Sequence, residues 1–312
     1  MHSVLRGALG LAVGAVVTTG AAGLGALAYA NRVELNRFTV RHEQLPLPHG
    51  LPRWSGSQPV RLLHISDIHY VPGQQKKFDW LQSLAGFEPD LVINTGDNLS
   101  HPAAVPELLE ALAPLRRFPG AFVPGSNDYY APSAKNPLSY LRGPSTHEED
   151  RQELPWREMF LTFGTSGWVE LTNRNHATTV GPRPVHLSGT DDAHIGRAQV
   201  TGWPLGIADT SALKLGITHS PDSQVLLRFA DAGADLILAG HTHGGQVCLP
   251  GGRALVTNSD LPASQAKGLS TVTASDGREV PLHVSAGIGT SAKAPIRLNC
   301  PPEATILDLV PA

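Results

Sequence analysis

The chain has 312 residues, enough for one large or two modest domains, and 41% of them are hydrophobic, which suffices for a sizeable core. Its formal net charge of −3 gives no support to a nucleic-acid-binding protein. The two cysteines, Cys248 and Cys300, lie far apart and match no metal-binding spacing. A disulfide between them is possible but not required, so the cysteines do not indicate in which redox compartment the protein lies.

The N-terminal stretch 7–30 contains no charged residue and consists mostly of Ala, Gly, Val and Leu. A transmembrane helix needs about 20 such residues, so we predict that residues 1–36 form a single-pass membrane anchor. A cleaved signal peptide, followed by export, is the alternative, because Ala28-Tyr29-Ala30 resembles a cleavage site. Arginines lie on both sides of the stretch, so the side of the membrane on which the rest of the chain lies is open.

A strand and a proline-rich linker are predicted over residues 37–59, and the main domain over residues 60–312. Within this domain, strands are predicted at Val60–Ser66, Leu91–Asn94, Ala121–Pro124, Val169–Leu171, Val185–Ser188, Leu215–Thr218, Leu236–Ala239, Val247–Thr257, His283–Ala286 and Thr305–Leu309. Helices are predicted at Lys77–Ala85, Pro106–Arg117, Trp156–Gly164 and Val225–Ala232. This alternation predicts an α/β fold, in which ligands bind at the carboxyl ends of the strands. The polar stretch 131–155 is predicted to be an exposed insertion, with a lid over the substrate as the alternative.

Polar side chains follow five of these strands directly. They are Asp67 and His69, then Asp97, then Ser126, Asn127 and Asp128, then His219, and finally His241 and His243. Because the carboxyl ends of such strands meet at one edge of a sheet, we expect these loops to converge. Carboxylate and imidazole ligands together suit Mn, Fe or Zn better than Ca or Mg. The series therefore predicts a pair of divalent metal ions with Asp97 as a bridging ligand, an arrangement typical of displacement at phosphorus.

The ordered series resembles the calcineurin-like metallophosphoesterases, and within them the membrane-associated YkuE/YaeI-like branch. The resemblance covers roughly Arg61 to Leu309, and it is carried by the five motifs together with Gly240–Gln246 and Ser285–Ser291. It implies a four-layer α/β/β/α sandwich with two mixed sheets, preceded by one transmembrane helix. It also implies two divalent metal ions, with Mn²⁺ as the first expectation and Fe or Zn as alternatives.

The resemblance further implies which residue binds which ion. The first ion would take Asp67, His69, Asp97 and His243. The second ion would take Asp97, His219, His241 and the amide of the third motif.

The third motif departs from the family. The usual pattern is G-N-H-D/E, in which Asn binds metal and His acts as an acid or orients the substrate, but here the stretch is Gly125-Ser126-Asn127-Asp128. We favour Asn127 as the metal ligand; the alternative is Ser126 as a weak ligand, with Asn127 on the phosphate. Asn127 and Asp128 are the predicted catalytic residues.

The general acid of the family is absent at this position, and His101 and His194 are the candidate substitutes. A general acid is typically worth about 10²–10⁴ in rate. A substrate with a good leaving group, such as a pyrophosphate, would lose least from its absence.

These patterns predict a membrane-tethered, metal-dependent hydrolase of phosphoester or pyrophosphate bonds that uses a metal-activated water. The expected substrate is a phosphorylated small molecule or a lipid-linked or envelope precursor; a nucleotide or phosphoprotein is open. The alternative is a catalytically impaired, metal-containing module that binds phosphorylated ligands, which the altered third motif would explain.

Overall fold

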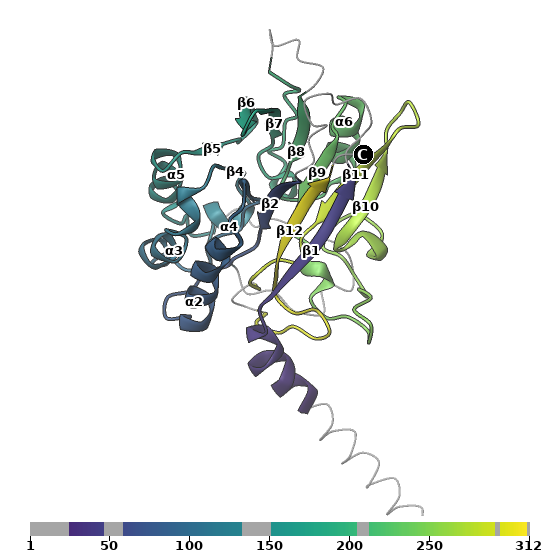
Figure 1. Cartoon of the computed structure of the whole chain (residues 1–312). Coiled ribbons are helices and arrows are strands. Elements are labelled where there is room, and N and C mark those ends of the chain that lie inside the picture. Colours follow the sequence, from purple (N-terminus) through teal and green to yellow (C-terminus); the bar gives the residue numbers. More distant parts are fainter. Residues whose placement is uncertain (1–24, 47–58, 133–150, 205–211, 291–293, 311–312) are drawn as a thin grey trace, which may run out of the picture.

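The computed structural model describes residues 25–46, 59–132, 151–204, 212–290 and 294–310. Two six-stranded sheets pack face to face, and helices cover their outer faces (Figure 1). The expected four-layer α/β/β/α arrangement with two mixed sheets is therefore observed.

The first sheet contains four adjacent parallel strands, β2 to β5, so their carboxyl ends lie at the same edge. Strand β12 is antiparallel to β2, and β1 is parallel to β12. In spatial order the strands are β1 (Thr39–Pro46), β12 (Glu303–Val310), β2 (Val60–Ile65), β3 (Leu91–Asn94), β4 (Gly120–Phe122) and β5 (Trp168–Glu170).

The second sheet also has four adjacent parallel strands, β7, β8, β9 and β11, but here one antiparallel strand lies at each edge. In spatial order the strands are β10 (Gly268–Thr273), β11 (Glu279–Val284), β9 (Leu236–Ala239), β8 (Leu213–Ile217), β7 (Arg183–Gly189) and β6 (Arg174–Val180).

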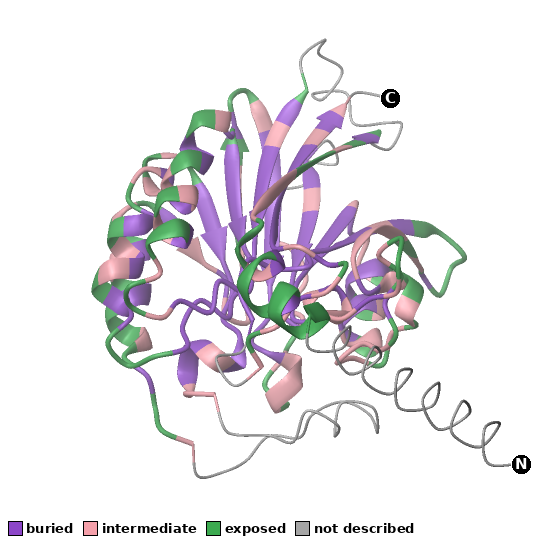
Figure 2. Cartoon of the chain, turned by 90° about the horizontal axis from the view of Figure 1, so that it is seen from below, coloured by how far each residue is buried: buried purple, intermediate pink, exposed green. Residues whose placement is uncertain are grey.

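Helices cover the outer faces of both sheets. The first sheet packs against α2 (Gln75–Ser83), α3 (Val105–Ala111) and α5 (Trp156–Thr165), and the second against α6 (Ser223–Asp231). The outward faces of the helices are exposed while the strands are buried (Figure 2). Short helical segments lie in the loops, at Glu34–Asn36, Leu84–Phe87, Leu115–Arg117, Ser126–Tyr129 (α4), Ala193–Ile195, His243–Gly245 and Ala263–Gln265.

The space between the sheets is filled by branched apolar side chains. Leu62, Ile93 and Val123 from the first sheet belong to the same buried cluster as Leu215 and Leu238 from the second. Because side chains alternate along a strand, the neighbours of these residues point to the helices instead. This shared core holds the carboxyl-end loops of the two sheets against each other.

One histidine pair adds a polar contact between the sheets. His64 on β2 and His283 on β11 are fully buried, and their Nδ1 atoms lie 2.9 Å apart. Burial lowers the pKa of both rings, so they pair as neutral imidazoles.

The strand expected at Val247–Thr257 is wrong. Only isolated bridges form there, at Val247 and Cys248. Pro250 lacks a backbone N–H and Gly251 has a φ of 87°, so the chain turns instead of extending. Strands β6 and β10 were not predicted, because these edge strands are mostly polar and half-buried or exposed.

The N-terminal part of the chain is described only in part. Strand β1 is the strand predicted within residues 37–59, and it pairs with β12 along its full length, so it belongs to the folded domain. Within the described ranges, no helix has the length and apolar character needed to cross a membrane. Most of the predicted anchor, residues 1–24, lies outside the described residues, as do residues 47–58 and 133–150.

Substitution of Leu215 by Ala should test the shared core. Leu215 is fully buried between the sheets, so we expect Leu215→Ala to lower the free energy of unfolding by about 2–5 kcal/mol. The matched control is Leu161→Ala on α5, where the side chain is 68% exposed. Urea unfolding of the two variants should differ clearly, and equal losses would contradict this account of the core.

Candidate metal centre

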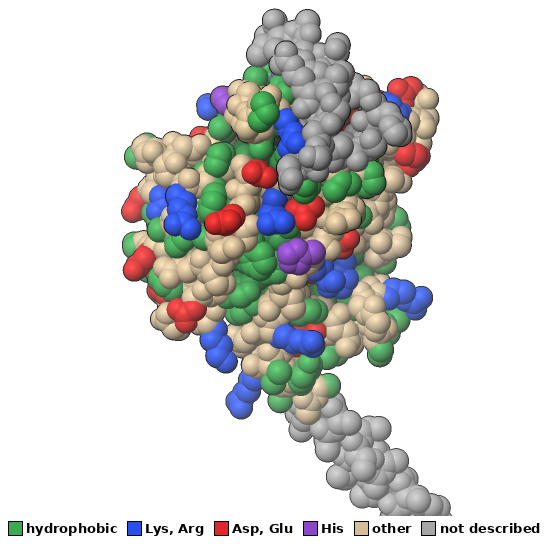
Figure 3. All heavy atoms as spheres, in the orientation of Figure 1, with side chains coloured by type: hydrophobic (Ala, Val, Ile, Leu, Met, Phe, Trp, Pro, Cys, Tyr) green, Lys and Arg blue, Asp and Glu red, His purple; other side chains and the backbone are tan. Residues whose placement is uncertain are grey.

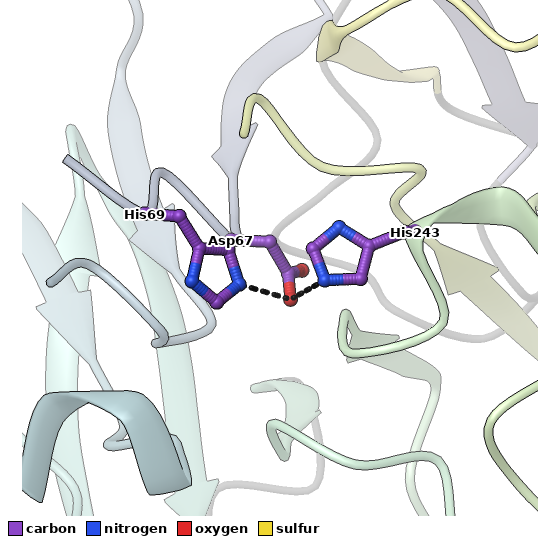
Figure 4. Close-up of side chains that lie close together, drawn as sticks. All are labelled: Asp67, His69 and His243. Atoms are coloured by element: carbon purple, nitrogen blue, oxygen red, sulfur yellow. Dashed lines mark ion pairs between the residues drawn. The ribbon is translucent and has the colours of Figure 1, made fainter. Parts of the chain in front are cut away.

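The structure brings six of the seven predicted metal-ligand residues together at the carboxyl ends of β2, β3, β8 and β9. Two sets of potential ligand atoms lie within 4.8 Å of one another: Asp67, His69 and His243, and Asp67, Asp97 and His219. Asp67 belongs to both sets, and Figure 4 shows the first of them. His241 adjoins the second set, since its Nδ1 lies 3.3 Å from His219 Nε2.

The first set surrounds a carboxylate oxygen with two imidazole nitrogens. Asp67 Oδ1 lies 4.0 Å from His69 Nε2 and 3.7 Å from His243 Nε2. The two rings are stacked, with centroids 5.0 Å apart. Figure 4 shows both rings turned toward the carboxylate between them.

Asp97 connects the two sets. Its Oδ2 lies 3.5 Å from His69 Nε2 and 3.4 Å from His219 Nε2, and these histidines come from different sheets. One oxygen thus faces both imidazoles, which is the placement that a bridging carboxylate requires.

Neighbouring groups fix which ring nitrogen of each histidine faces the centre. The Nδ1–H groups of His219 and His243 donate to the carbonyl oxygens of Thr95 (2.7 Å) and Gly289 (3.1 Å). His241 is reversed: its Nε2–H donates to the Asn258 carbonyl at 2.9 Å, which leaves Nδ1 toward His219. In each ring the nitrogen that faces the centre is therefore unprotonated in the neutral form and can bind a metal.

Two buried polar atoms support the fit to a cation. Asp67 Oδ1 and His69 Nε2 are buried without a hydrogen-bond partner within the described residues. Such atoms are costly to bury unless another group binds them. An anionic oxygen and an imidazole lone pair in contact are suited to a divalent cation.

The pKa values favour neutral rings at His69, His241 and His243 and an ionised carboxylate at Asp97, whereas His219 is favoured in its charged form. Burial lowers the pKa of His69 to about 4, and it also lowers the pKa values of His241 and His243. Burial lowers the pKa of His219 too, but the charges of Asp97 and Asp192 outweigh it and raise this pKa. Burial raises the pKa of Asp97, but His219 and His69 outweigh it and hold this pKa well below its usual range.

The backbone at the centre is strained. Asp67, His69, Asp97, His241 and His243 all have φ between 44° and 69°. This left-handed region is uncommon for residues other than glycine and is concentrated at functional sites. The strained turns aim consecutive motif residues into one space.

Asn127 is in contact with the centre as a hydrogen-bond donor. Its backbone N–H and its Nδ2 donate to the two carboxylate oxygens of Asp97, both at 2.7 Å. Its Oδ1 accepts from Arg151 Nη2 at 2.9 Å. The ligand role predicted for Asn127 would require the amide to turn over and to release Arg151.

Ser126 and Asp128 lie on either side of Asn127 in buried positions. The Ser126 N–H donates to Asp192 Oδ2 at 2.8 Å. The Asp128 carboxylate accepts from the backbone N–H groups of Asp97 and Gly125, both at 2.9 Å, and of Asn98 at 2.7 Å. The structure therefore places Asp128, a predicted catalytic residue, where it positions the Asp97 loop.

The two candidate substitutes for the missing acid lie in different surroundings. The His194 ring is 4.7 Å from the His241 ring, at the border of the centre. His101 is exposed, and its Nδ1 accepts from the N–H of Ala103. The geometry favours His194 over His101.

Sequence reasoning missed three residues that contact the site. Ser100 Oγ pairs with His69 Nδ1 at 3.0 Å, and Arg151 bonds Asn127. Asp192 caps the short helix Ala193–Ile195, since its Oδ1 accepts from the His194 N–H at 2.9 Å, and its Oδ2 also accepts from the Ser126 N–H. None of the three lies in a recognisable motif. Only Ser100 could have been suspected of contacting the site, because it lies three residues after Asp97.

Comparison with known proteins supports the geometry. The sequence profile described as calcineurin-like phosphoesterase matches residues 60–245. The uncharacterized metallophosphoesterase YkoQ of Bacillus subtilis is 27% identical over 262 residues, which cover 82% of this chain and 84% of that protein. The phosphodiesterase YaeI of Escherichia coli is also 27% identical over 262 residues, covering 81% and 83%.

A solved structure is similar at low identity. The protein TT1561 of Thermus thermophilus is 11% identical and covers 73% of this chain and 90% of its own, with a TM-score of 0.41.

Removal of the Ser100 hydroxyl should weaken metal binding. The hydroxyl holds His69 with Nε2 toward the centre, and loss of such a contact typically costs about 10–100-fold in metal affinity. We expect Ser100→Ala to raise the dissociation constant for Mn²⁺ by this factor in a titration. The exposed Ser83→Ala should leave it unchanged; an unchanged constant in both variants would contradict the role of Ser100.

Replacement of Asp128 by Asn should destabilise the Asp97 loop. The two carboxylate oxygens of Asp128 accept backbone N–H groups, whereas an asparagine amide has only one acceptor oxygen. Each buried N–H group left without an acceptor costs about 1–3 kcal/mol. Urea unfolding at pH 8 should show a loss of at least this size in Asp128→Asn, with the exposed Asp276→Asn as the control.

The same variant should change the pH dependence of stability. Burial raises the pKa of Asp128 from 3.8 to about 7, so the folded state binds this proton more tightly than the unfolded state does. The contribution of Asp128 to stability therefore falls as the pH rises from about 4 to 7. Between pH 4 and 7, the free energy of unfolding should fall more steeply with pH in the unmodified protein than in Asp128→Asn. Identical slopes would show that the pKa of Asp128 is not raised.

Proposed function

The chain belongs to the calcineurin-like phosphoesterase family and is a metallophosphoesterase, and we propose that it hydrolyses phosphoester or pyrophosphate bonds with two divalent metal ions and a metal-activated water. The observation that carries the proposal is the position of Asp97 Oδ2, at 3.5 Å and 3.4 Å from imidazole nitrogens of two different sheets. His69 belongs to the first set of potential ligands and His219 to the second.

The residues of the first position would be Asp67, His69, Asp97 and His243, and those of the second Asp97, His219 and His241. When bound, two such ions would activate a water and neutralise charge on the phosphoryl oxygens. The chain contributes imidazoles of fixed orientation, because carbonyl oxygens and Ser100 hold the ring nitrogens that face away from the centre. Mn²⁺ is the first candidate, and Fe and Zn are the alternatives.

The third motif limits the leaving group. An amide at position 127 cannot protonate a departing oxygen, so a leaving group that is stable as an anion is favoured; His194, at the border of the centre, is the alternative proton donor. A pyrophosphate meets this condition. Since the Escherichia coli relative is named a phosphodiesterase, phosphodiesters are the other class to test first.

We place the substrate at a membrane, as a lipid-linked or envelope precursor, because residues 7–30 are uncharged over a length that can span a bilayer. Export after cleavage near Ala30 is the alternative location. On the face shown in Figure 3, basic and acidic side chains are interspersed, which fits a small or lipid substrate better than nucleic acid.

Hydrolysis of bis(p-nitrophenyl) phosphate by the purified full chain should require added Mn²⁺. Asp97→Ala removes the oxygen shared by both positions, so we expect turnover to fall by at least about 10³-fold. The exposed Asp276→Ala should retain full activity. Phosphate binding without turnover in the unmodified protein would instead favour the module that only binds phosphorylated ligands.

A further inference from the structure

A cavity of about 340 Å³ adjoins the first set of potential metal ligands. Its lining includes His69 itself and Gly289, whose carbonyl accepts from His243 Nδ1 at 3.1 Å. The volume lies in the lower part of the range of small-molecule sites, about 300–1,000 Å³. Because a predicted metal ligand lines the cavity, a phosphoryl group bound at the centre would have the cavity beside its substituent.

Five apolar side chains line the cavity, and they come from three separate regions of the chain. Ile288 belongs to the buried cluster under the helices of the first sheet, and Phe38 packs against the same cluster. Phe38 also stacks on Trp80 of α2, with ring centroids 5.0 Å apart. These contacts hold the apolar lining in place in the absence of a ligand. The five residues are Leu35, Phe38, Val71, Ile288 and Pro295.

Most polar side chains of the lining already bond to the protein. Gln74 Oε1 accepts from a backbone N–H at 3.1 Å, and Gln75 Nε2 donates to a carboxylate of its own helix at 2.7 Å. Lys77 Nζ and Asn36 Nδ2 donate to backbone carbonyl oxygens at 2.8 Å and 3.2 Å. Because these groups are engaged and the remaining lining is largely apolar, the cavity favours an apolar occupant.

The segment that carries Leu35 and Phe38 follows a helix with exposed apolar side chains. Residues 25–32 are helical and lie below β1 in Figure 1. Leu27, Tyr29 and Val33 are 56%, 39% and 51% exposed. Exposed aliphatic side chains together with a tyrosine are typical of a helix at a membrane surface.

Hydrogen bonds hold the end of this helix against the loop that contributes Pro295 to the cavity. The Arg297 N–H donates to the Ala30 carbonyl at 3.1 Å, and Asn31 Nδ2 donates to the Pro295 carbonyl at 2.6 Å. The lining of the cavity therefore extends from the metal centre to the segment 35–38, directly after the helix.

We propose, on the basis of the function proposed above, that this cavity binds the alkyl or acyl part of a membrane lipid whose phosphoryl group lies at the metal centre. The occupant is a substituent of phosphorus because His69 is part of the lining. It is apolar because the lining offers aliphatic and aromatic surface. Its source is the bilayer because the adjoining helix exposes the apolar side chains that such a surface would cover.

Phosphonates of two chain lengths test the cavity without turnover. In calorimetric titrations of the full chain with Mn²⁺, hexylphosphonate should bind at least about 10-fold more tightly than methylphosphonate, because each buried methylene is worth roughly fourfold in affinity. Excess inorganic phosphate should displace hexylphosphonate, since both use the centre. Equal affinities of the two phosphonates, tighter binding of adenosine monophosphate, or hexylphosphonate that stays bound in excess phosphate would each overturn the proposal.

Substitution of Leu35 by Gln should weaken the chain-length effect. The change places an amide in the lining at nearly the same side-chain size, so the dissociation constant of hexylphosphonate should rise by about 10-fold, the equivalent of roughly two buried methylenes. That of methylphosphonate should stay within twofold. The control is Leu255→Gln, at a side chain that is 53% exposed and outside the cavity lining. A constant for hexylphosphonate that is the same in both variants would contradict the proposal.

Photo-crosslinking locates the alkyl chain in the unmodified protein. A hexylphosphonate with a terminal diazirine should label Leu35, Val71 or Pro295, and excess inorganic phosphate should suppress the label. Labelling confined to residues outside the cavity would overturn the proposal. Because titration and labelling both measure binding, they separate failure of this cavity from failure of the proposed hydrolysis.

Vesicles test whether the occupant comes from the bilayer. With the full chain reconstituted in phosphatidylcholine vesicles, added phosphatidic acid should compete with the diazirine probe and reduce its labelling of the cavity. Equal labelling in vesicles with and without phosphatidic acid would exclude the bilayer as the source of the occupant.

Discussion

The position of the Asp97 carboxylate is the constraint on which the centre depends. A single oxygen must face imidazoles from two sheets, so the loop after β3 has to project into the seam between them. Asp97 adopts a φ of 55° to do this, and the Asp128 carboxylate accepts the backbone N–H groups of Asp97 and Asn98 within the turn. Burial of the Asp128 carboxylate costs free energy, as its raised pKa shows. This cost accompanies the fixed geometry of the turn.

Close packing of the loops makes this geometry specific. A Cβ atom at Gly125 would lie 2.3 Å from Asp97 Oδ1, and one at Gly240 would lie 1.9 Å from the Ser66 hydroxyl oxygen. The motif glycines are therefore required because the backbone of one loop lies against the ligand side chain of the next. The shared apolar core of the two sheets brings those loops to this distance.

Buried cations complete the electrostatics of the site. Arg297 is fully buried, and its Nη2 donates to the carbonyls of Ala286, Gly287 and Gly289. The Gly289 carbonyl also accepts from His243, so Arg297 and a predicted metal ligand share one acceptor. Lys77 Nζ donates to the carbonyl of Ile68 at 2.8 Å, beside His69, and burial lowers its pKa to about 7. Arg297 therefore keeps positive charge behind the centre, where it balances the buried carboxylates, and Lys77 adds to it below about pH 7.

The sequence by itself determined the α/β class, most of the strands and the residues that gather at the centre. Apolar segments such as Leu91–Asn94 and Leu236–Ala239 are buried on both faces, so their strand character is visible without context, and each motif residue follows such a strand directly. The edge strands β6 and β10 were not predictable, because their polar side chains carry no burial signal. Tertiary structure alone decided the partners of the third motif. Arg151 is 24 residues from Asn127 in sequence and Asp192 is 66 from Ser126, and contacts over such separations are set by packing of the loops rather than by local spacing.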